Sequence, residues 1–402
     1  TGVYFSCYTT GNAAGKAASM ASASEIKAEL VDLLHHQGFE LVGFSRPEPP
    51  IHLATYLDWI ASGRHAGMAY LATERALHRR ANPAEILPEV RTIVVVGLRY
   101  ATPIRRDDPG ENAIQGRVAA YALGRDYHEV IPPRLEQAAQ VMQERMGITA
   151  QWRAYTDTGP ILERDYAMAA GLGWIGKNTC LISPQHGSYF LLGELFLDIQ
   201  LEPDPPFASD QCGTCTRCIQ ACPTDCILPD RTLDSARCIS YLTIENKGEI
   251  PLDLRPKLGE WIFGCDICQQ VCPWNLRFAA PNGDPTLEPL DADLSLPLHA
   301  ELRLSPQEFN RKFKGRAVLR ARRRGYLRNG AVSLGNAHDP AALPDLRECL
   351  LHEAEPLVRA HAAWALGQFD QDEARSALAG ALEVEQDPGV LAEIRRALHL
   401  AT

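Results

Sequence analysis

Eight cysteines between residues 212 and 272 have the spacing of iron–sulfur cluster ligands. A first run has the form C-x2-C-x2-C-x3-C followed by Pro223, and a second run ends the same way before Pro273. Three thiolates two residues apart can surround one 4Fe–4S cluster, whereas the cysteine before proline typically ligates the other cluster. The spacing therefore predicts two ligand sets: Cys212, Cys215, Cys218 and Cys272 for the first cluster, and Cys222, Cys238, Cys265 and Cys268 for the second.

A zinc site is the competing interpretation of these cysteines, because CxxC pairs also bind tetrahedral zinc. Zinc does not account for the two cysteine–proline endings, so the spacing favours clusters. Cys7, Cys180 and Cys349 stand apart from the pattern and are interpreted as unpaired thiols.

Three polar stretches punctuated by glycine precede the cysteines: YALGRDYH, YTDTGPILERDYA and GLGWIGKNT. Asp157 follows an apolar strand pattern and precedes a Thr-Gly-Pro turn, where active-site carboxylates of α/β domains are often found. On the residues alone, an N-cap or turn aspartate is the commoner interpretation of Asp157, and a structural role is the commoner one for His128. The string GLGWIG follows a helix-like segment, so it is only weak evidence for nicotinamide or flavin binding.

Strand and helix patterns alternate over residues 24–202 and predict an α/β domain. An amphipathic helix is expected to begin at Ser24 as its N-cap, a further helix to run from Leu53 to Leu71 with interruptions, and another from Val130 to Met146. The expected strands are ELVGFS, TIVVVGLRY, QWRAYTDT and FLLGELFLDIQL. Residues 1–23 are set aside as a disordered or expression-derived leader, with Met20 a plausible native start.

Two proline-rich links divide the remainder of the chain. A ferredoxin-like domain with the two clusters is expected at residues 203–280, and a helical domain at residues 281–402. In the latter, LRNGAVSLGN, VRAHAAWALGQF and VLAEIRRALHL begin at Leu327, Val358 and Val390, a step of about 30 residues that is typical of stacked HEAT-like helix pairs. A plain helical tail is the alternative, since three repeats are near the minimum for stability.

Composition sets outer limits on function. The chain has 402 residues, of which 46% are hydrophobic, as in globular proteins of two or three domains. A formal charge of -10 gives no overall attraction to nucleic acid. No apolar run approaches the roughly 20 residues that span a bilayer. Thiolates kept for iron suit a reducing cytoplasm.

A basic segment departs from this acidic average. Between Arg303 and Arg328 there are ten Lys or Arg residues and one acid, Glu308. Such a cluster on an acidic protein indicates contact with a phosphate backbone, although a solvated helix face is the usual alternative. The candidate nucleic-acid contacts are Arg316, Arg320, Arg322, Arg323, Arg324 and Arg328.

From about Glu25 to Phe369 the chain resembles the epoxyqueuosine reductases, which are cobalamin-dependent iron–sulfur enzymes. The resemblance rests on several long motifs in one order: YALGRDYH, DTGPILER, GLGWIGKNT, GSYFLLGELFLDI, CGTCTRCIQACPTDCI, RCISYLTIE, GCDICQQVCPWN and LRNGAVSLGN. It implies a multidomain fold, α/β and α+β in class, and reduction of epoxyqueuosine to queuosine at the wobble position of tRNA. Cys180 stands where an apolar residue is usual in this family.

The resemblance also implies how the work is divided among residues. The clusters would pass electrons to a corrinoid cobalt, with the second set nearer to it, and Asp157 matches the family's proposed proton donor. To act near neutral pH, its pKa would have to be raised by burial against the corrin. The implied cobalamin contacts are Arg80, Asp157, Lys177, Asn178 and Ser240.

Two other functions remain open at this point. A reductive dehalogenase also combines a corrinoid with two clusters, but the basic segment and the repeats have no use in that chemistry. A plain two-cluster electron carrier would need neither cobalamin nor tRNA. The leading hypothesis expects a cytoplasmic monomer that binds the anticodon stem-loop carrying epoxyqueuosine and accepts electrons from an external low-potential donor.

Overall fold

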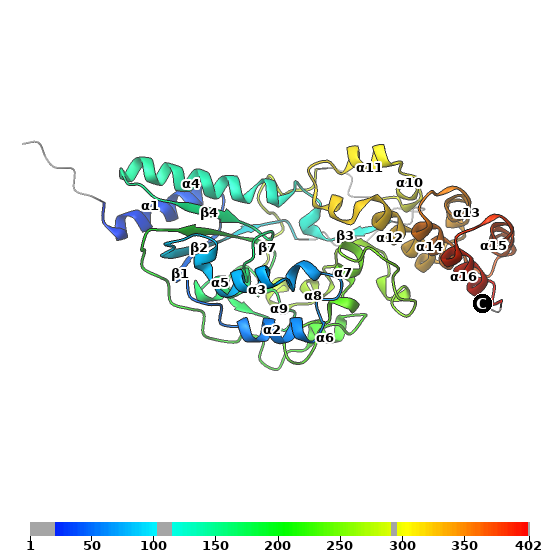
Figure 1. The fold of residues 1–402 in the computed structure, drawn as a ribbon, viewed down its shortest axis with the longest axis horizontal. Coiled ribbons are helices and arrows are strands. Elements are labelled where there is room, and N and C mark those ends of the chain that lie inside the picture. Colours follow the sequence, from blue (N-terminus) through cyan, green and yellow to red (C-terminus); the bar gives the residue numbers. More distant parts are fainter. Residues whose placement is uncertain (1–20, 103–114, 291–295, 401–402) are drawn as a thin grey trace, which may run out of the picture.

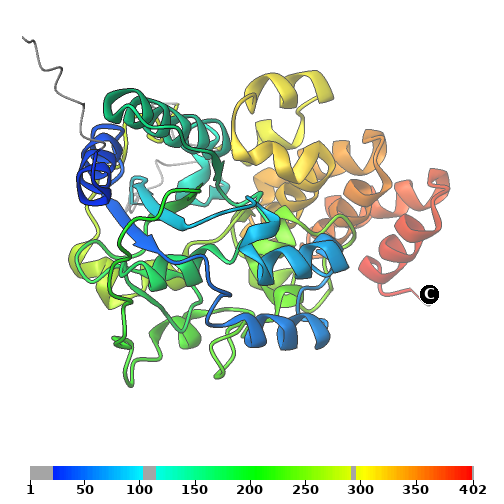
Figure 2. The same cartoon turned by 60° about the vertical axis from the view of Figure 1, so that its left-hand side comes forward.

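The computed structural model describes residues 21–102, 115–290 and 296–400. Most of the expected leader, including Met20 and Cys7, lies outside these ranges. Two views of the ribbon place a sheet with its helices at one end of the molecule and the last helices at the other end (Figures 1 and 2). Within the described ranges, no helix combines the length and apolar character needed to cross a membrane.

A four-stranded sheet organises the N-terminal part, in the order β1-β2-β7-β4. Its strands are β1 (Leu41–Ser45), β2 (Thr92–Arg99), β7 (Phe190–Leu197) and β4 (Trp152–Tyr155). They confirm the four expected strands, and every neighbouring pair is antiparallel. All but the last residue of β2 is buried, which explains its continuous apolar sequence.

Helices cover both faces of this sheet (Figure 1). On one face, α1 (Ala23–His36) and α4 (Ile131–Met146) share an apolar cluster with residues of β2 and β7. On the other face, α5 (Glu163–Ala169) buries Tyr166 and Ala167 against the same strands. The sheet is therefore enclosed between helical layers, and polar groups in its centre are shielded from water.

The N-cap of α1 differs from the expected one. Ser22 caps the helix by accepting the Glu25 N–H, while the Glu25 carboxylate accepts the Ser22 N–H. The prediction of Ser24 was wrong, because the glutamate three residues after the cap completes a capping box only with Ser22.

Short elements connect the sheet to the cysteine region. These are α2 (Leu53–Ala61), η1 (Ala69–Leu71), α3 (Glu74–Ala81), η2 (Pro83–Glu85), β3 (Arg117–Val118), η3 (Ala120–Ala122), η4 (Tyr127–Glu129), β5 (Trp174–Ile175) and β6 (Leu181–Ile182). The helix expected from Leu53 to Leu71 ends at Ala61, close to Gly63, whose φ of +69° is left-handed.

The cysteine region consists of short helices joined by loops. They are α6 (Arg217–Ala221), η5 (Ser235–Arg237), α7 (Ile239–Ile244), η6 (Pro256–Leu258), α8 (Ile267–Gln270) and α9 (Pro273–Phe278), with the strand β8 (Trp261–Phe263). Cys272 is the N-cap of α9, and Pro273 occupies the first turn, where its missing N–H costs no helical hydrogen bond. β8 pairs in parallel with β3, which ties this region to the N-terminal part.

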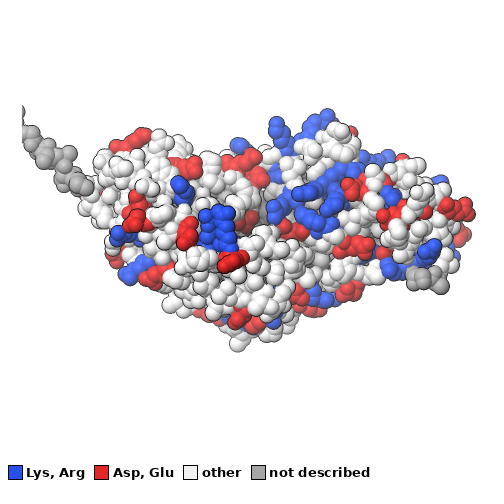
Figure 3. Space-filling view, viewed as in Figure 1, with Lys and Arg blue, Asp and Glu red and all other residues white. Residues whose placement is uncertain are grey.

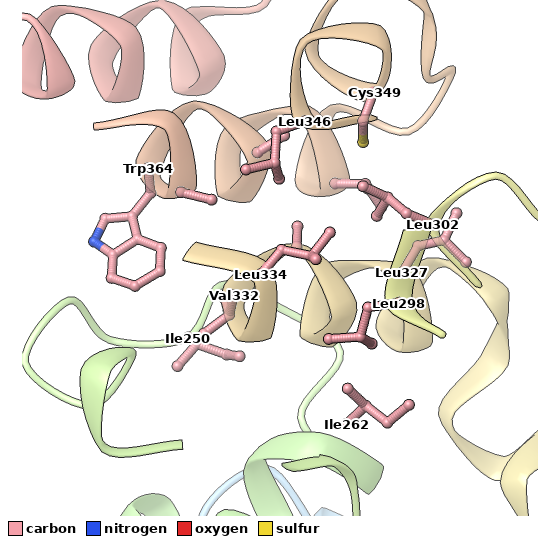
Figure 4. Close-up of a cluster of buried hydrophobic side chains, with 14 of the residues drawn as sticks. Ile250, Ile262, Leu298, Leu302, Leu327, Val332, Leu334, Leu346, Cys349 and Trp364 are labelled. Carbon is pink, nitrogen blue, oxygen red and sulfur yellow. The ribbon is translucent and has the colours of Figure 1, made fainter. Parts of the chain in front are cut away.

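The C-terminal part is helical. It contains α10 (Leu298–Leu302), α11 (Pro306–Lys312), η7 (Ala317–Ala321), α12 (Arg322–Ala337), η8 (Pro340–Ala342), α13 (Leu343–His352), α14 (Pro356–Leu366), α15 (Asp372–Val384) and α16 (Pro388–Ala397). One apolar cluster joins these helices to the cysteine region: Ile250 and Ile262 lie below Val332 and Leu334 of α12 (Figure 4). The helix α12, whose first residues are basic, is thus packed directly against the part that carries the cysteines.

Candidate active site and metal centres

The first set of cysteines surrounds one cavity. Cys212, Cys215, Cys218 and Cys272 all line it, together with Lys177, Asn178 and Trp274. The indole Nε1 of Trp174 donates to Cys212 Sγ over 3.4 Å. Four thiols around one cavity form a donor set that suits a 4Fe–4S cluster.

Lys177 and Asn178 belong to this cavity. Lys177 Nζ donates to the main-chain oxygens of Gly213 (2.7 Å) and Cys215 (2.9 Å), so it fastens the first cysteine loop. Asn178 is buried, and its Nδ2 has no hydrogen-bond partner among the described residues. Because the β5–β6 hairpin packs on the cysteine loop, this placement does not support the corrin contact expected of either residue.

The second set of cysteines includes a neighbour that the spacing analysis left unassigned. Cys226 is buried, its Sγ lies 3.4 Å from Cys222 Sγ, and it also contacts Cys238. The hydrogen bond with Cys226 and the N–H groups of Tyr241 and Ser240 lower the pKa of Cys238 to about 7, against the effect of burial. Ser240 therefore touches the second set through its main chain.

Cys265 and Cys268 complete this group. Cys265 lies close enough to Cys238 and Cys222 to interact with them electrostatically. Cys268 interacts in the same way with Cys265 and Cys238. Cys180 makes a hydrogen bond with Cys268, so this thiol lies beside the second set and is not isolated. The structure thus gathers the cysteines into the two groups named above, with Cys226 and Cys180 next to the second.

Asp157 lies in a tight turn after β4, and its main chain has a φ of +56°. A non-glycine residue in the left-handed region is uncommon and persists where its surroundings fix it. The main-chain N–H of Asp157 donates a short hydrogen bond to Glu163 Oε1 at the start of α5. The Asp157 side chain is 65% exposed and points away from the sheet core.

Two residues of η4 meet the Asp157 carboxylate. His128 Nε2 lies 3.4 Å from Asp157 Oδ2, and His128 Nδ1 lies 2.7 Å from Asp126 Oδ1. The Tyr127 phenol also makes a hydrogen bond with Asp157. One histidine is therefore held between two carboxylates.

These contacts fix the charges of the site. Hydrogen bonds with Asp126 and Asp157 raise the pKa of His128 to about 9, although burial alone would lower it. The hydrogen bond from His128, its charge and the nearby Arg320 hold the pKa of Asp157 below its usual range. The expected rise in the Asp157 pKa is therefore contradicted for this conformation, because the hydrogen bond and the charge of His128 outweigh the effect of burial. The mobile proton of the pair resides on His128 at neutral pH.

One residue of the basic segment, Arg320, acts on Asp157. Arg320 forms an ion pair with Glu245 (2.7 Å) and lies over the ring of Tyr70, and its charge reaches Asp157. Figure 3 shows Lys and Arg side chains gathered around α11 and the start of α12. Arg322 and Arg320 are exposed, whereas Arg316 and Arg324 are partly buried.

Two of the six candidate arginines are engaged inside the protein. Arg328 is fully buried and donates to the main-chain oxygens of Leu242, Asn246 and Gly248. Arg323 donates to Leu304 O and forms an ion pair with Glu353 at 2.6 Å. Their predicted contacts with nucleic acid are not supported by this placement, since their donors are directed at protein oxygens.

Arg80 is the remaining candidate. It lies on α3, buried, with its guanidinium 5.5 Å from the centre of the Tyr56 ring on α2 and one donor on the Ala76 carbonyl. The neighbouring helix α2 buries none of its residues, although it contains Tyr56, Leu57 and Trp59.

Sequence analysis missed Tyr127, gave His128 a structural role, and left out the carboxyl group of Glu194. The clue for the first two was their place in YALGRDYH, a polar motif beside a strand end, but their link to Asp157 spans about 30 residues of chain. Glu194 had a clearer signal, because it is the one charged residue in the apolar strand FLLGELFL.

Comparison with protein families gives three matches along the chain. Residues 80–158 match the family described as "Epoxyqueuosine reductase QueG, DUF1730". Residues 211–275 match the 4Fe-4S double cluster binding domain, so the cysteine region is an iron–sulfur domain and not a zinc site. Residues 317–399 match HEAT repeats, which confirms the repeat architecture.

Curated relatives and solved structures agree with these matches. The epoxyqueuosine reductase of Pseudomonas aeruginosa is 42% identical over 340 residues (82% of this chain, 90% of the relative), and that of Escherichia coli K12 is 37% identical over 343 residues (82% and 86%). A crystal structure of epoxyqueuosine reductase with a tRNA-Tyr epoxyqueuosine-modified tRNA stem loop has a TM-score of 0.86 at 30% identity, covering 94% of this chain and 99% of the other.

A Bacillus subtilis epoxyqueuosine reductase, solved with its aspartate catalytic loop swung out of the active site, has a TM-score of 0.84 at 29% identity, covering 95% of this chain and 100% of the other. The antiparallel sheet, the double-cluster domain and the helical repeats thus recur in one order, in sequence and in structure, so the chain belongs to the epoxyqueuosine reductase family of oxidoreductases.

Proposed function

We propose that this chain reduces epoxyqueuosine to queuosine at the wobble position of tRNA. The reaction removes the epoxide oxygen as water and leaves a carbon–carbon double bond, so it consumes two electrons and two protons. The observation that carries the proposal is the His128–Asp157 pair, whose carboxylate is close enough to Arg320 of the basic segment to feel its charge. A proton source and a phosphate-binding surface therefore meet at one place.

The electrons would come through the iron–sulfur domain. We propose Cys212, Cys215, Cys218 and Cys272 as ligands of one cluster and Cys222, Cys238, Cys265 and Cys268 as ligands of the other, with an external low-potential donor. Lys177 and Trp174 would position and tune the first cluster through their bonds to its loop and to Cys212. Ser240 and Cys226 would do the same for Cys238.

Cobalamin is the proposed site of epoxide reduction. When bound, it would supply a low-valent metal reactive enough to open a strained epoxide, which no side chain can do. The apolar side chains of α2, none of which is fully buried, and the Arg80 guanidinium over the Tyr56 ring would suit a broad corrin whose rim carries polar amides. We assign Arg80, Asp157 and Ser240 to this site.

The acid of the reaction is proposed to be the His128–Asp157 pair. As the epoxide oxygen gains negative charge, the proton held by His128 would be delivered to it through Asp157, which lies 3.4 Å from His128 Nε2. The exposed carboxylate on a turn suits a catalytic loop of the kind described for the Bacillus subtilis enzyme.

Binding of tRNA is proposed to use the exposed part of the basic segment. Arg320 and Arg322, supported by Arg316 and Arg324, would contact phosphates of the anticodon stem-loop, whose unpaired wobble base can enter a pocket without disrupting a duplex. Arg323 and Arg328 would hold this surface in place from within. We further propose a cytoplasmic monomer in which residues 24–202 carry catalysis, 203–280 electron transfer, and 281–402 tRNA binding.

The decisive experiment is incubation of anaerobically reconstituted protein with cobalamin, a low-potential reductant and tRNA containing epoxyqueuosine. Digestion and mass analysis of the nucleosides should show queuosine, lighter than the epoxide by one oxygen. Omitting cobalamin should leave the epoxide intact. Unchanged epoxide with both clusters and cobalamin loaded would overturn the proposal, and formation of queuosine without any corrinoid would overturn the role of cobalamin.

A further inference from the structure

A pair of carboxyl groups lies behind Asp157, and the chemistry above makes no use of it. Glu194 is on β7, between β2 and β4, and is fully buried. Its side chain shares the sheet face of Phe196, where α5 covers an apolar cluster. Among the described residues, neither of its carboxyl oxygens accepts a hydrogen bond from an N–H group or a hydroxyl.

The partner of Glu194 is Glu163 at the start of α5. The two carboxyl groups are in hydrogen-bonding contact. Because two carboxylates have acceptors only, such a contact requires that one of them carries a proton. Burial and the neighbouring acid raise the pKa of Glu194 well above its usual range, and burial and Asp157 raise that of Glu163 to about 7. Glu194 is the more deeply buried of the two, so burial disfavours its ionised form most.

Glu163 connects this pair to the catalytic turn, because its Oε1 accepts the main-chain N–H of Asp157. That N–H belongs to a residue in the left-handed conformation, which costs on the order of 1 kcal/mol or more and needs fixed surroundings. An ionised Glu163 is a strong acceptor for the N–H, whereas a protonated one is weak. The ionisation of Glu163 is thereby coupled to the conformation of Asp157.

Other charged and titratable groups surround the pair. Tyr127 faces it from η4, Asp157 from the turn, and Arg164 and Tyr166 from α5. The charge of Arg164, an exposed residue of α5, favours the ionised form of Glu163. Glu194, as a hydrogen-bond donor from the core, favours that form as well.

We propose that Glu194 and Glu163 share one proton and act as a positioning pair that holds the turn carrying Asp157 in its active conformation. This inference rests on the proposed function, which makes Asp157 the acid. Acidification through the second protonation of the pair releases the turn and lowers turnover. Replacing Glu194 by a residue without a hydrogen-bond donor releases the turn at a higher pH, because Glu163 then takes up a proton more readily.

The test uses the full-length protein carrying both clusters and two readouts. The first is amide hydrogen exchange over residues 156–159, corrected for intrinsic exchange and measured without cobalamin or tRNA. The second is single-turnover conversion of epoxyqueuosine between pH 5.5 and 8. The variants are Glu163→Gln, Glu194→Leu and Glu194→Gln, and the control is Glu136→Gln, an exposed residue of α4.

Glu163→Gln is expected to lose most of the amide protection and to lower conversion at every pH. Glu194→Leu should shift the acidic fall in both readouts to higher pH by about one unit or more, whereas Glu194→Gln, which retains a donor, should resemble the unaltered protein. Glu136→Gln should change nothing. The inference would be overturned if Glu163→Gln and Glu194→Leu had the amide protection and the pH profile of the unaltered protein. It would also be overturned if these variants lost amide protection over residues 156–159 but converted epoxyqueuosine normally.

Failure of the proposed function would give different results in these two measurements. The loaded protein, unaltered, would then convert no epoxyqueuosine at any pH, while the exchange readout would still decide whether the pair holds the turn.

Discussion

His128 Nε2 faces Asp157 Oδ2 across 3.4 Å, while the other ring nitrogen is held by Asp126. This arrangement keeps a protonated imidazole beside an exposed carboxylate. In Asp157→Asn we expect turnover to fall about a hundredfold or more, the usual contribution of a positioned acid. Single-turnover assays measure the loss, and the cluster absorption and EPR spectra should be unchanged. Asp32→Asn, an exposed residue of α1, is the control, and normal turnover in Asp157→Asn would remove it from the acid's role.

The same pair predicts an alkaline limit to activity. The Asp126 and Asp157 carboxylates raise the pKa of His128 to about 9, against the effect of burial. The imidazole therefore keeps its proton below that pH and loses it above. His128 also stabilises the fold in this direction: its contribution is complete below the unfolded pKa of about 6.5 and fades as pH rises through 9. In His128→Asn turnover should be low throughout and the limb near pH 9 should vanish. A pH–rate profile with an unaltered limb would contradict this assignment.

Much of this site follows from local sequence, and the part that does not is held by distant contacts. The cysteine sets and the strands follow from spacing and apolar pattern, which act over a few residues. The partners of Asp157 lie in η4, about 30 residues earlier, and only packing brings them together. The same limit explains Arg328, which shares a charge run with Arg322 and yet enters the core, because the main-chain oxygens that receive it lie in the cysteine region.

That contrast predicts opposite phenotypes for two arginines of α12. Arg328→Gln should leave buried oxygens without donors and lower the free energy of unfolding by on the order of 3 kcal/mol. Arg322→Gln should leave stability within about 0.5 kcal/mol. In tRNA binding, however, Arg322→Gln should weaken affinity and reduce the slope of log K against log salt by about one.

Urea unfolding and salt-titrated binding of the modified stem-loop measure the two effects. Arg395→Gln, at an exposed position on α16, is the control for a remote positive charge. A salt slope in Arg322→Gln equal to that of the control would favour a merely solvated helix face, and normal stability of Arg328→Gln would contradict its structural role.

Trp174 should tune the first cluster through its hydrogen bond to Cys212 Sγ. An N–H donor directed at a ligand sulfur stabilises the reduced cluster, which carries the more negative charge, so its removal lowers the reduction potential. Trp174→Phe keeps an aromatic ring against Trp274 but removes the N–H that donates to Cys212 Sγ. Trp274→Phe is the matched control, because its indole donates to the Gln211 carbonyl and not to sulfur. EPR-monitored redox titration should find a lower potential for one cluster in Trp174→Phe only; equal potentials in both variants would exclude the hydrogen bond as the cause.

The last repeat is anchored to the cysteine region by a buried ion pair. Arg255 Nη1 and Glu393 Oε1 lie 3.0 Å apart with side chains 1% and 4% exposed, and Arg255 also lies over the Trp364 ring. Glu393→Met leaves that guanidinium buried without its counter-ion, which should cost roughly 3–5 kcal/mol of unfolding free energy. The double variant Arg255→Met with Glu393→Met should recover most of the loss, because no unpaired charge remains.

A matched control for the anchoring pair is available on α13. Glu348 pairs with His352 at the surface, with side chains 62% and 65% exposed, so Glu348→Met should change stability by less than about 1 kcal/mol. Urea unfolding followed by tryptophan fluorescence compares the variants. If the double variant is as unstable as Glu393→Met, the loss comes from missing packing and not from the stranded charge. The ion pair would then not be what joins α16 to the cysteine region.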